Sequence, residues 1–212
     1  MEYKKIVQYY ESCFEKHGDT PEGVDWTKPE QVDNRYKVML DIMFYKERSF
    51  NHNKTISLLD YGCGLSHLYE YINKNNIKNI NYTGLEISKK FYAKSLNKFP
   101  ENKYILGDLL TDNSILKENY DYIIMNGVFT EKRELSYETM FEYFASMIKK
   151  IYDYSNKGIA FNVMSKQVDW EVGSLFHVPL DDMANFLTKT ISRNFIIRND
   201  YGLYEYTVYL YK

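Results

Sequence analysis

The feature that most constrains the fold is a regular alternation of strand-like and helix-like segments in the middle of the chain. Short apolar runs typical of strands occupy residues 55–61, 80–87, 103–109, 120–129 and 157–165. Helical patterns separate them, at residues 66–76, 88–99 and 136–155. Strands joined through helices pair in parallel, and the helices then cover both faces of the sheet. The alternation therefore predicts an α/β domain built on a mainly parallel sheet.

The alternation stops after residue 165. Residues 166–191 form a long insertion that ends in a helical pattern, and strand-like runs follow at 194–200 and 204–212. Only a short connection around Gly202 separates these two runs, which favours a β-hairpin. The seventh and last strand is therefore expected to run antiparallel to its neighbour. Before the alternation, helices are expected at residues 2–16 and from about 28 to 48.

Composition excludes several classes of protein. The chain has 212 residues and a net charge of −2, so no bulk positive charge favours nucleic acid or an anionic membrane. It contains no run of about 18 apolar residues that could span a bilayer. The two cysteines, Cys13 and Cys63, lack the spacing of metal ligands. We expect a cytoplasmic protein without a metal site, a membrane span or a nucleic-acid partner.

A glycine loop follows the first strand-like run, in the stretch LLDYGCGLSHL. A dinucleotide-binding loop would need a small residue where His67 stands, and a phosphate-binding Walker loop would need a Gly-Lys-Ser/Thr sequence. Asp60, two residues before Gly62, would repel a pyrophosphate and would suit a ligand that carries an ammonium group. The glycines could also serve only a tight strand-to-helix turn. If they hold a cofactor, a nicotinamide dinucleotide is disfavoured.

The loop resembles motif I of the class I S-adenosylmethionine-dependent methyltransferases, with Ser66 where a third glycine is frequent. Three later stretches, YTGLEIS, ILGDLL and YDYIIMNGVF, resemble the family in the same order, so that the resemblance covers about residues 56–165. It implies that Glu86 holds the ribose hydroxyls and that Asp108 and the backbone of Leu109 meet the adenine. The full set of cofactor-binding residues that we expect is Arg35, Asp60, Gly62, Cys63, Gly64, Glu86, Ile87, Asp108, Leu109 and Asn126.

The resemblance implies a doubly wound, Rossmann-like sheet of seven strands with helices on both faces and a small helical cap. It also implies S-adenosylmethionine as the cofactor and S-adenosylhomocysteine as the product. We expect one methyltransferase domain over residues 1–212. Its parts are a helical cap or lid (1–50), a cofactor-binding core (56–165), an acceptor-side insertion (166–190) and a terminal β-hairpin (191–212).

The acceptor class is narrowed by what the sequence lacks. The Asn/Asp-Pro-Pro-aromatic tetrad of amino-methyltransferases is absent after the fourth strand, where Asn126 to Phe129 read NGVF. Neither cysteine follows a proline, as the nucleophile of cytosine C5 enzymes does. The stretch NGVFTEKRE has no clear equivalent of the acids that hold Mg²⁺ in catechol-type enzymes. We therefore expect methyl transfer to an oxygen or nitrogen of a small soluble molecule, such as a sugar or another metabolite.

Aromatic residues outside the alternating core are candidates for a lid or an acceptor pocket; they are Tyr9, Tyr10, Trp26, Phe129, Trp170 and Phe176. Packing anchors are the alternative interpretation of the two tryptophans. Candidate catalytic groups are His177, Asp169 and His17, because histidine exchanges protons near neutral pH and a carboxylate can bind an acceptor amine or hydroxyl. Surface or structural roles remain open for all three, and His67 is interpreted as structural.

Two other functions remain open. The chain could methylate a protein or RNA, or it could be a non-catalytic S-adenosylmethionine-binding partner subunit. A basic groove would favour RNA, and a broken motif would favour the partner subunit; the sequence shows neither. A monomer and a homodimer are both compatible with the sequence.

Overall fold

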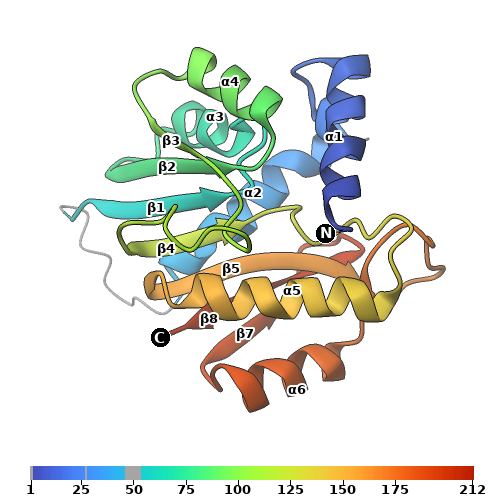
Figure 1. The fold of residues 1–212 in the computed structure, drawn as a ribbon. Helices are drawn as coiled ribbons and strands as arrows, with labels where there is room; N and C mark the ends of the chain where they lie inside the picture. Colours follow the sequence, from blue (N-terminus) through green and yellow to red (C-terminus); the bar gives the residue numbers. More distant parts are fainter. Residues whose placement is uncertain (1, 27, 46–53) are drawn as a thin grey trace.

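The fold is built on one mixed sheet with the strand order β3-β2-β1-β4-β5-β8-β7, in a computed structural model that describes residues 2–26, 28–45 and 54–212 (Figure 1). Five parallel strands form most of it: β1 (Ile56–Tyr61), β2 (Ile80–Glu86), β3 (Lys103–Leu106), β4 (Tyr120–Met125) and β5 (Ser155–Ser165). The last strand, β8 (Glu205–Tyr211), lies between β5 and β7 (Phe195–Arg198) and is antiparallel to both. The predicted mainly parallel sheet with an antiparallel last strand is confirmed.

The structure adds an eighth strand, β6 (His177–Val178), which pairs with the end of β5. Two residues are too few to produce an alternating pattern, so the sequence does not predict this strand. The hairpin between β7 and β8 is also longer than expected: residues 199–204 connect the two strands, and Gly202 has a φ of 73° within that turn.

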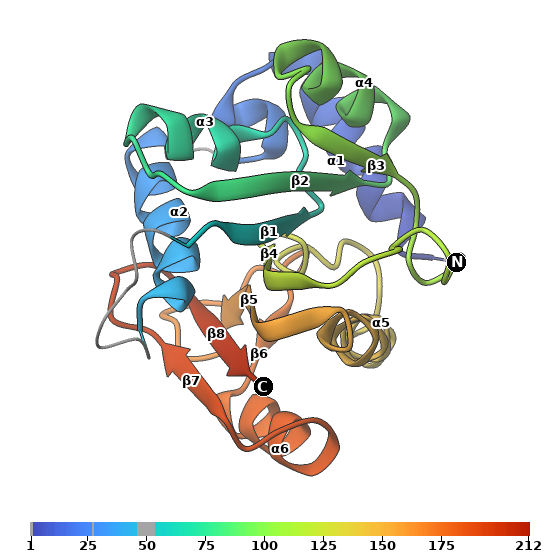
Figure 2. The same cartoon turned by 90° about the vertical axis from the view of Figure 1, so that its left-hand side faces the viewer.

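Helices cover both faces of the sheet, as Figure 2 shows in a view turned by 90°. The helices α2 (Val32–Leu40) and α3 (His67–Lys74) share one apolar core with Leu58 of β1, whereas α5 (Tyr137–Tyr152) and α6 (Leu180–Thr190) share the other with Leu59. Successive strand residues point to opposite faces, so neighbouring leucines serve opposite layers. The helix α4 (Lys89–Lys98) packs against β2 and β3.

The helix α1 (Lys4–His17) stands beside the carboxyl ends of the central strands and does not cover a face of the sheet (Figure 1). A short 3₁₀ helix, η1 (Pro21–Val24), returns the chain toward the sheet, and two more, η2 (Pro29–Gln31) and η3 (Asp41–Met43), flank α2. The predicted helix from 28 to 48 is therefore divided, and its expected end at residue 48 lies outside the described residues. No helix in the described parts of the chain has both the length and the apolar character needed to cross a membrane.

Candidate active site

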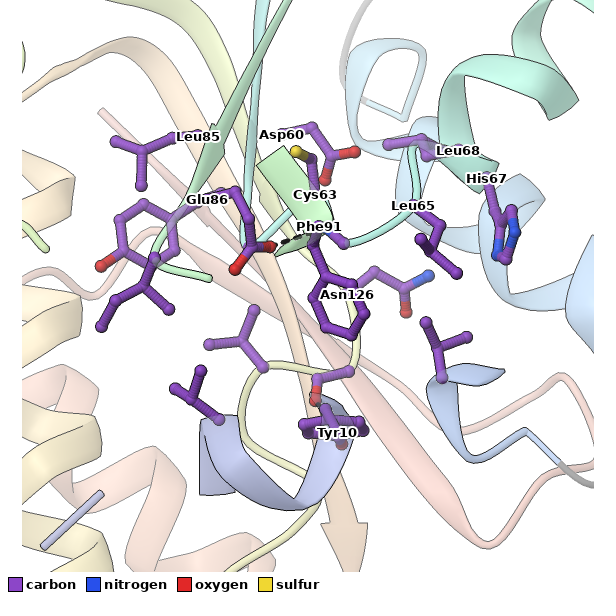
Figure 3. Close-up of a pocket in the computed structure, with 18 of the residues that line it drawn as sticks. Tyr10, Asp60, Cys63, Leu65, His67, Leu68, Leu85, Glu86, Phe91 and Asn126 are labelled. Atoms are coloured by element: carbon purple, nitrogen blue, oxygen red, sulfur yellow. Dashed lines mark hydrogen bonds between the residues drawn. The ribbon is translucent and has the colours of Figure 1, made fainter. Parts of the chain in front are cut away.

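A cavity opens at the carboxyl ends of β1, β2 and β4, where the strand order reverses and α/β sheets commonly bind ligands (Figure 3). Its volume is about 150 Å³. One water needs roughly 10–15 Å³ on the same measure, so the space is that of a ligand and not of a single buried water. The glycine loop and the end of β2 form one wall, and residues of α1 together with Val24 and Trp26 form another.

The glycine loop owes its shape to three residues with left-handed backbone conformations. Gly62 has a φ of 72° and Gly64 a φ of 53°, and a Cβ on Gly62 would lie 2.8 Å from a methyl carbon of Val128. Ser66 has a φ of 58°, which is uncommon for a residue with a side chain. Its conformation explains why glycine is frequent at this position in the family that the sequence resembles.

Glu86 ends β2 beneath this loop and is 5% exposed. Its Oε2 accepts a hydrogen bond of 2.8 Å from the backbone N–H of Gly64, drawn as a dashed line in Figure 3, and its Oε1 accepts one of 2.8 Å from that of Ser88. Burial raises the pKa of the Glu86 carboxyl, and the backbone N–H groups oppose that rise. Each carboxylate oxygen can accept more than one hydrogen bond, so Glu86 retains capacity for two ligand hydroxyls.

Asp60 lies on the other side of the glycine loop and is 3% exposed. Burial, together with the charge of Glu86, raises its pKa to about 7, although the hydroxyl of Tyr82 donates a hydrogen bond of 2.8 Å to its Oδ2. A cation bound nearby would favour the ionised form of this carboxyl.

Asp108 lines the cavity where β3 has ended. Its Oδ1 accepts from the backbone N–H of Leu110 at 3.0 Å, and its Oδ2 accepts from the hydroxyl of Tyr3 at 2.6 Å. The Tyr3 ring stacks on Tyr143 with a centroid distance of 4.5 Å. The neighbouring Leu109 is fully buried. The structure therefore brings Asp108 to the cavity and places against it the phenol of Tyr3, the residue directly before α1.

Asn126 follows β4 and carries the one side chain of the cavity whose polar atoms are buried without partners within the described residues. Both its Oδ1 and its Nδ2 lack a hydrogen bond. Figure 3 shows the amide lying between Glu86 and His67. A buried amide without partners costs free energy, which a ligand with complementary groups would recover.

The charges around the cavity have one sign. Three carboxyl groups line it, those of Asp60, Glu86 and Asp108, and the described lining residues include no lysine and no arginine. The single histidine, His67, is held by Asp19, with 2.9 Å between Nε2 and the carboxylate. Such a site disfavours a phosphate and suits a ligand with positive groups and hydroxyls.

Comparisons with known proteins agree with this geometry. Residues 59–152 match the family model of a methyltransferase domain, Methyltransf_12. A protein of Mycobacterium tuberculosis, Rv1506c, whose name describes a methyltransferase, is 22% identical over 78% of this chain and 98% of its own length. This chain contains a class I methyltransferase domain. The family depends on S-adenosylmethionine, so the family and the cofactor predicted from the sequence are confirmed.

Solved structures share the fold of this methyltransferase. Magnesium protoporphyrin IX methyltransferase from Synechocystis, crystallised with S-adenosylhomocysteine, has a TM-score of 0.65 at 15% identity, over 99% of both chains. The plantazolicin methyltransferase BpumL, crystallised with a pentazolic desmethylPZN analogue and S-adenosylhomocysteine, has a TM-score of 0.64 at 15% identity, over 98% of this chain and 94% of its own. At such identities the likeness concerns the fold alone.

Most of the predicted cofactor-binding residues of the methyltransferase meet at the cavity; these are Asp60, Gly62, Cys63, Gly64, Glu86, Ile87, Asp108 and Asn126. Arg35 does not line it. Its guanidinium lies 3.0 Å from a carboxylate oxygen of Glu205 and 5.3 Å from the ring centre of Trp26. Leu109 does not line it either, because its side chain belongs to the core shared with α5.

The predicted acceptor residues divide in the same way. Tyr10 and Trp26 line the cavity, whereas the Tyr9 hydroxyl turns to Asp25 at 2.7 Å. Phe129 and Phe176 are fully buried in the core, where each lies close to Phe144. The ring of Trp170 is 67% exposed beside Tyr204 and does not line the cavity.

None of the three predicted catalytic groups lines the cavity. His177 is 7% exposed; its Nδ1 lies 2.6 Å from the carbonyl oxygen of Ser165, and its Nε2 accepts from the backbone N–H of Val172 at 3.2 Å. Both ring nitrogens are thus used to fasten the loop after β5. Asp169 accepts from the hydroxyl of Tyr204 at 3.3 Å, and His17 ends α1.

Six aromatic or titratable residues line the cavity although the sequence did not predict them there: Tyr3, Tyr36, Tyr61, His67, Phe91 and Tyr143. Tyr3 directly precedes α1 and Tyr143 lies on α5, so the two residues are distant in the chain, and only folding brings their rings together. A signal existed for His67, because it directly follows the glycine loop where a helix begins.

Proposed function

We propose that this methyltransferase binds S-adenosylmethionine in the cavity above β1, β2 and β4 and transfers its methyl group to an oxygen or nitrogen of a small molecule. The observation that carries the proposal is the acid-lined cavity, in which three carboxyl groups and an unpartnered amide surround a space without lysine or arginine among its described walls. S-adenosylmethionine, when bound, supplies a methyl group on a positively charged sulfur.

The residues of the cavity fit such a ligand group by group. We assign the ribose hydroxyls to Glu86 and the nucleobase amine to Asp108, which is the use that the family resemblance implies. The positive-φ glycines Gly62 and Gly64 let the backbone approach the ligand closely. We assign Asp60 and the amide of Asn126 to the amino-acid part of S-adenosylmethionine. The ammonium group of that part would favour the ionised form of Asp60.

The residues on the acceptor side orient the substrate and exclude water. Tyr10, Val24, Trp26 and Val128 form an apolar and aromatic wall, and the hydroxyl of Tyr10 donates to the carbonyl oxygen of Gly127 at 3.4 Å. In-line transfer depends on alignment, and a closed apolar wall supplies it. No histidine lines this wall within the described residues. We therefore propose an acceptor that needs no catalytic base from this wall. A neutral amine, or a hydroxyl acidic enough to bind in its ionised form, meets this requirement.

A larger acceptor is the second candidate. The descriptions of the two structural relatives named above contain a magnesium protoporphyrin and a pentazolic desmethylPZN analogue. In this chain, the exposed pair Trp170 and Tyr204, with ring centres 6.2 Å apart, lies on the loop after β5 and just before β8. Rings in this position favour an acceptor whose body extends beyond the cavity.

We further propose that residues 2–26 act as the cap and that the whole chain is one domain. Contacts between this segment and the core support the assignment: Glu11 accepts from the hydroxyl of Ser88 at 2.5 Å, and Asp19 pairs with Lys98 at 3.1 Å. The rest of the segment predicted as a cap, α2, packs on the sheet. The predicted acceptor-side insertion, residues 166–190, is divided in the same way. Its helix α6 packs on α5, so only residues 166–176 lie near the ends of the strands.

Calorimetry with the purified protein tests cofactor binding. We expect binding of S-adenosylmethionine and S-adenosylhomocysteine, and none of NAD. Micromolar binding of NAD without a response to S-adenosylhomocysteine would overturn the assignment. A labelled methyl donor, presented with pools of small metabolites, peptides and RNA, then distinguishes the acceptor classes. Cofactor binding without turnover in any pool would favour a non-catalytic partner subunit.

A further inference from the structure

A chain of buried polar groups runs behind the cavity, from α2 to the loop after β4. Arg35 of α2 donates from its Nε to Oε2 of Glu205 on β8 at 3.0 Å. Oε1 of Glu205 accepts from the amide of Asn162 on β5 at 3.0 Å, and Oδ1 of Asn162 accepts from the backbone N–H of Gly127 at 2.8 Å. We call these four residues the Arg35–Gly127 relay.

The relay is buried where polar groups are costly. Glu205 is 2% exposed, Asn162 is fully buried, and the Arg35 side chain is 16% exposed. A buried carboxylate destabilises a fold unless it is paired and hydrogen-bonded, and Glu205 meets both conditions. Apolar residues of similar volume could fill a central sheet position at no such cost. The relay therefore calls for an explanation beyond packing.

Its last member holds the floor of the cavity. Gly127 has a φ of 77°, so this loop adopts a backbone conformation that few other residues accept. The indole of Trp26 lies directly over it, because a Cβ on Gly127 would meet that ring at 3.4 Å. Arg35 lies over the same indole at 5.3 Å. Both ends of the relay thus lie against Trp26, which lines the cavity.

The next residue back along the chain is Asn126, whose unpartnered amide faces the cavity. A hydrogen bond that fixes the N–H of Gly127 also fixes the peptide unit that joins it to Asn126. We infer that Glu205 is a positioning residue for methyl transfer: through Asn162 it holds the Asn126–Gly127 loop, and through Arg35 it holds the Trp26 wall. This inference rests on the proposed function of the cavity.

Glu205→Gln and Asn162→Ala test the relay. Glu205→Gln keeps the volume and an acceptor for Asn162 but removes the charge that pairs with Arg35, while Asn162→Ala frees the N–H of Gly127. The matched control is Asp121→Asn. The carboxylate of Asp121 on β4 also links two strands, because it accepts from the backbone N–H of Ser57 on β1 at 3.1 Å. This contact lies at the amino ends of the strands, away from the cavity.

Two kinds of measurement, NMR and enzyme kinetics, separate positioning from general stability. By NMR, the hydrogen-exchange rate and the proton chemical shift of the Gly127 N–H report whether the relay is intact, without any substrate. We expect exchange at Gly127 to accelerate at least tenfold in Asn162→Ala and to stay within twofold of wild type in Asp121→Asn. With an acceptor, we expect kcat to fall at least tenfold in both relay variants, while the KM for S-adenosylmethionine changes less than threefold.

Each outcome decides one claim. Unchanged exchange at Gly127 in Asn162→Ala would overturn the relay, whatever the enzyme does. An equal loss of kcat in Asp121→Asn would overturn positioning and leave only stability. If the wild-type protein binds no S-adenosylmethionine but Gly127 responds as expected, the proposed function fails and the structural relay stands.

Discussion

The two halves of the cavity differ in how they are built. On the cofactor side, the glycine loop, Glu86 and Asp108 follow β1, β2 and β3, and each lies within a few residues of its strand end. On the acceptor side, Tyr10, Trp26 and Val128 come from three separate segments. The first half is determined by local sequence next to a shared sheet edge, whereas the second depends on how distant segments pack. Substitutions should therefore affect the first half through direct ligand contacts and the second through geometry.

The largest effect is expected at Glu86. Glu86→Ala removes two charge-assisted hydrogen bonds to the ribose, each worth about 1.5–3 kcal/mol before compensation by water, so we expect a loss of roughly 2–4 kcal/mol in cofactor binding. The variant also leaves the N–H groups of Gly64 and Ser88 without acceptors, so a lower melting temperature is expected. Calorimetry with S-adenosylhomocysteine measures the loss. Glu101→Ala, at a site that only accepts from Tyr69 at 3.3 Å, is the control.

Unchanged affinity in a folded Glu86→Ala protein would show that the ribose is held elsewhere. It would also remove the main contrast between the two halves of the cavity, because the cofactor side would then depend on distant contacts as well.

A smaller effect, on pH dependence, is expected at Asp60. Its folded-state pKa is about 7, above the ordinary 3.8, so the folded protein holds a proton between these values that the unfolded chain has lost. The contribution of Asp60 to the free energy of unfolding therefore falls as pH rises from 4 to 7. This change is at most about 4 kcal/mol. Asp60→Asn should be more stable than wild type at pH 8 and lose that advantage at pH 4, measured by urea unfolding.

Cofactor binding should show the opposite dependence on pH. A positively charged ligand favours ionised Asp60, so wild-type affinity for S-adenosylmethionine should rise about tenfold from pH 6 to pH 8. Asp60→Asn should flatten this profile. A profile that stays steep in Asp60→Asn would assign the pH dependence to another group of the cavity.

The sequence predicted more of the cofactor side than of the acceptor side, for physical reasons. A strand that ends in an acid or a glycine delivers that residue to the carboxyl edge of the sheet, so the alternation predicts this edge, and the family resemblance selects Gly62, Glu86 and Asp108 along it. The antiparallel last strand was predictable because the two strand-like runs follow each other without a helix between them, although the connection in the structure, residues 199–204, is longer than expected. His177 shows the limit of such reasoning, because its imidazole fastens a loop through both ring nitrogens. No local pattern distinguishes that use from catalysis.

Long-range pairs account for the other differences. Arg35 was expected near the cofactor, but its helix packs beside β8, and a buried carboxylate on that strand takes the guanidinium. The contact joins residues that lie 170 positions apart. Phe129 and Phe176 are large apolar residues, and burial in the core stabilises them more than exposure at a ligand wall would.

A test of the cap follows from its contacts. Polar bonds hold residues 16–26 to the core, among them the pair of Asp19 with His67. We expect ligand binding to increase the hydrogen-exchange protection of these amides by about tenfold, because ordering the segment costs entropy that bound ligands offset. Amides in β1 serve as the control and should not change. If residues 16–26 are already as protected as β1 without ligand, this segment is a fixed wall. The test stops at residue 26 because Thr27 lies outside the described residues.

The smallest expected effect concerns Tyr3, which links the two halves of the cavity. Its hydroxyl donates to Oδ2 of Asp108, the group that we assign to the nucleobase amine, so the phenol and the ligand compete for one carboxylate. Tyr3→Phe keeps the ring that stacks on Tyr143 and removes only this hydrogen bond, which is worth about 0.5–1.5 kcal/mol.

Because that bond stabilises the free protein alone, Tyr3→Phe should bind S-adenosylhomocysteine about two- to twelvefold more tightly in calorimetry. Tyr9→Phe is the matched control, since its hydroxyl donates to another carboxylate, that of Asp25, from the helix that Tyr3 precedes, and its affinity should equal that of wild type. Weaker binding by Tyr3→Phe would show that the phenol stays on Asp108 in the complex. The cap would then contribute a cofactor contact, and the two halves of the cavity would be built as one.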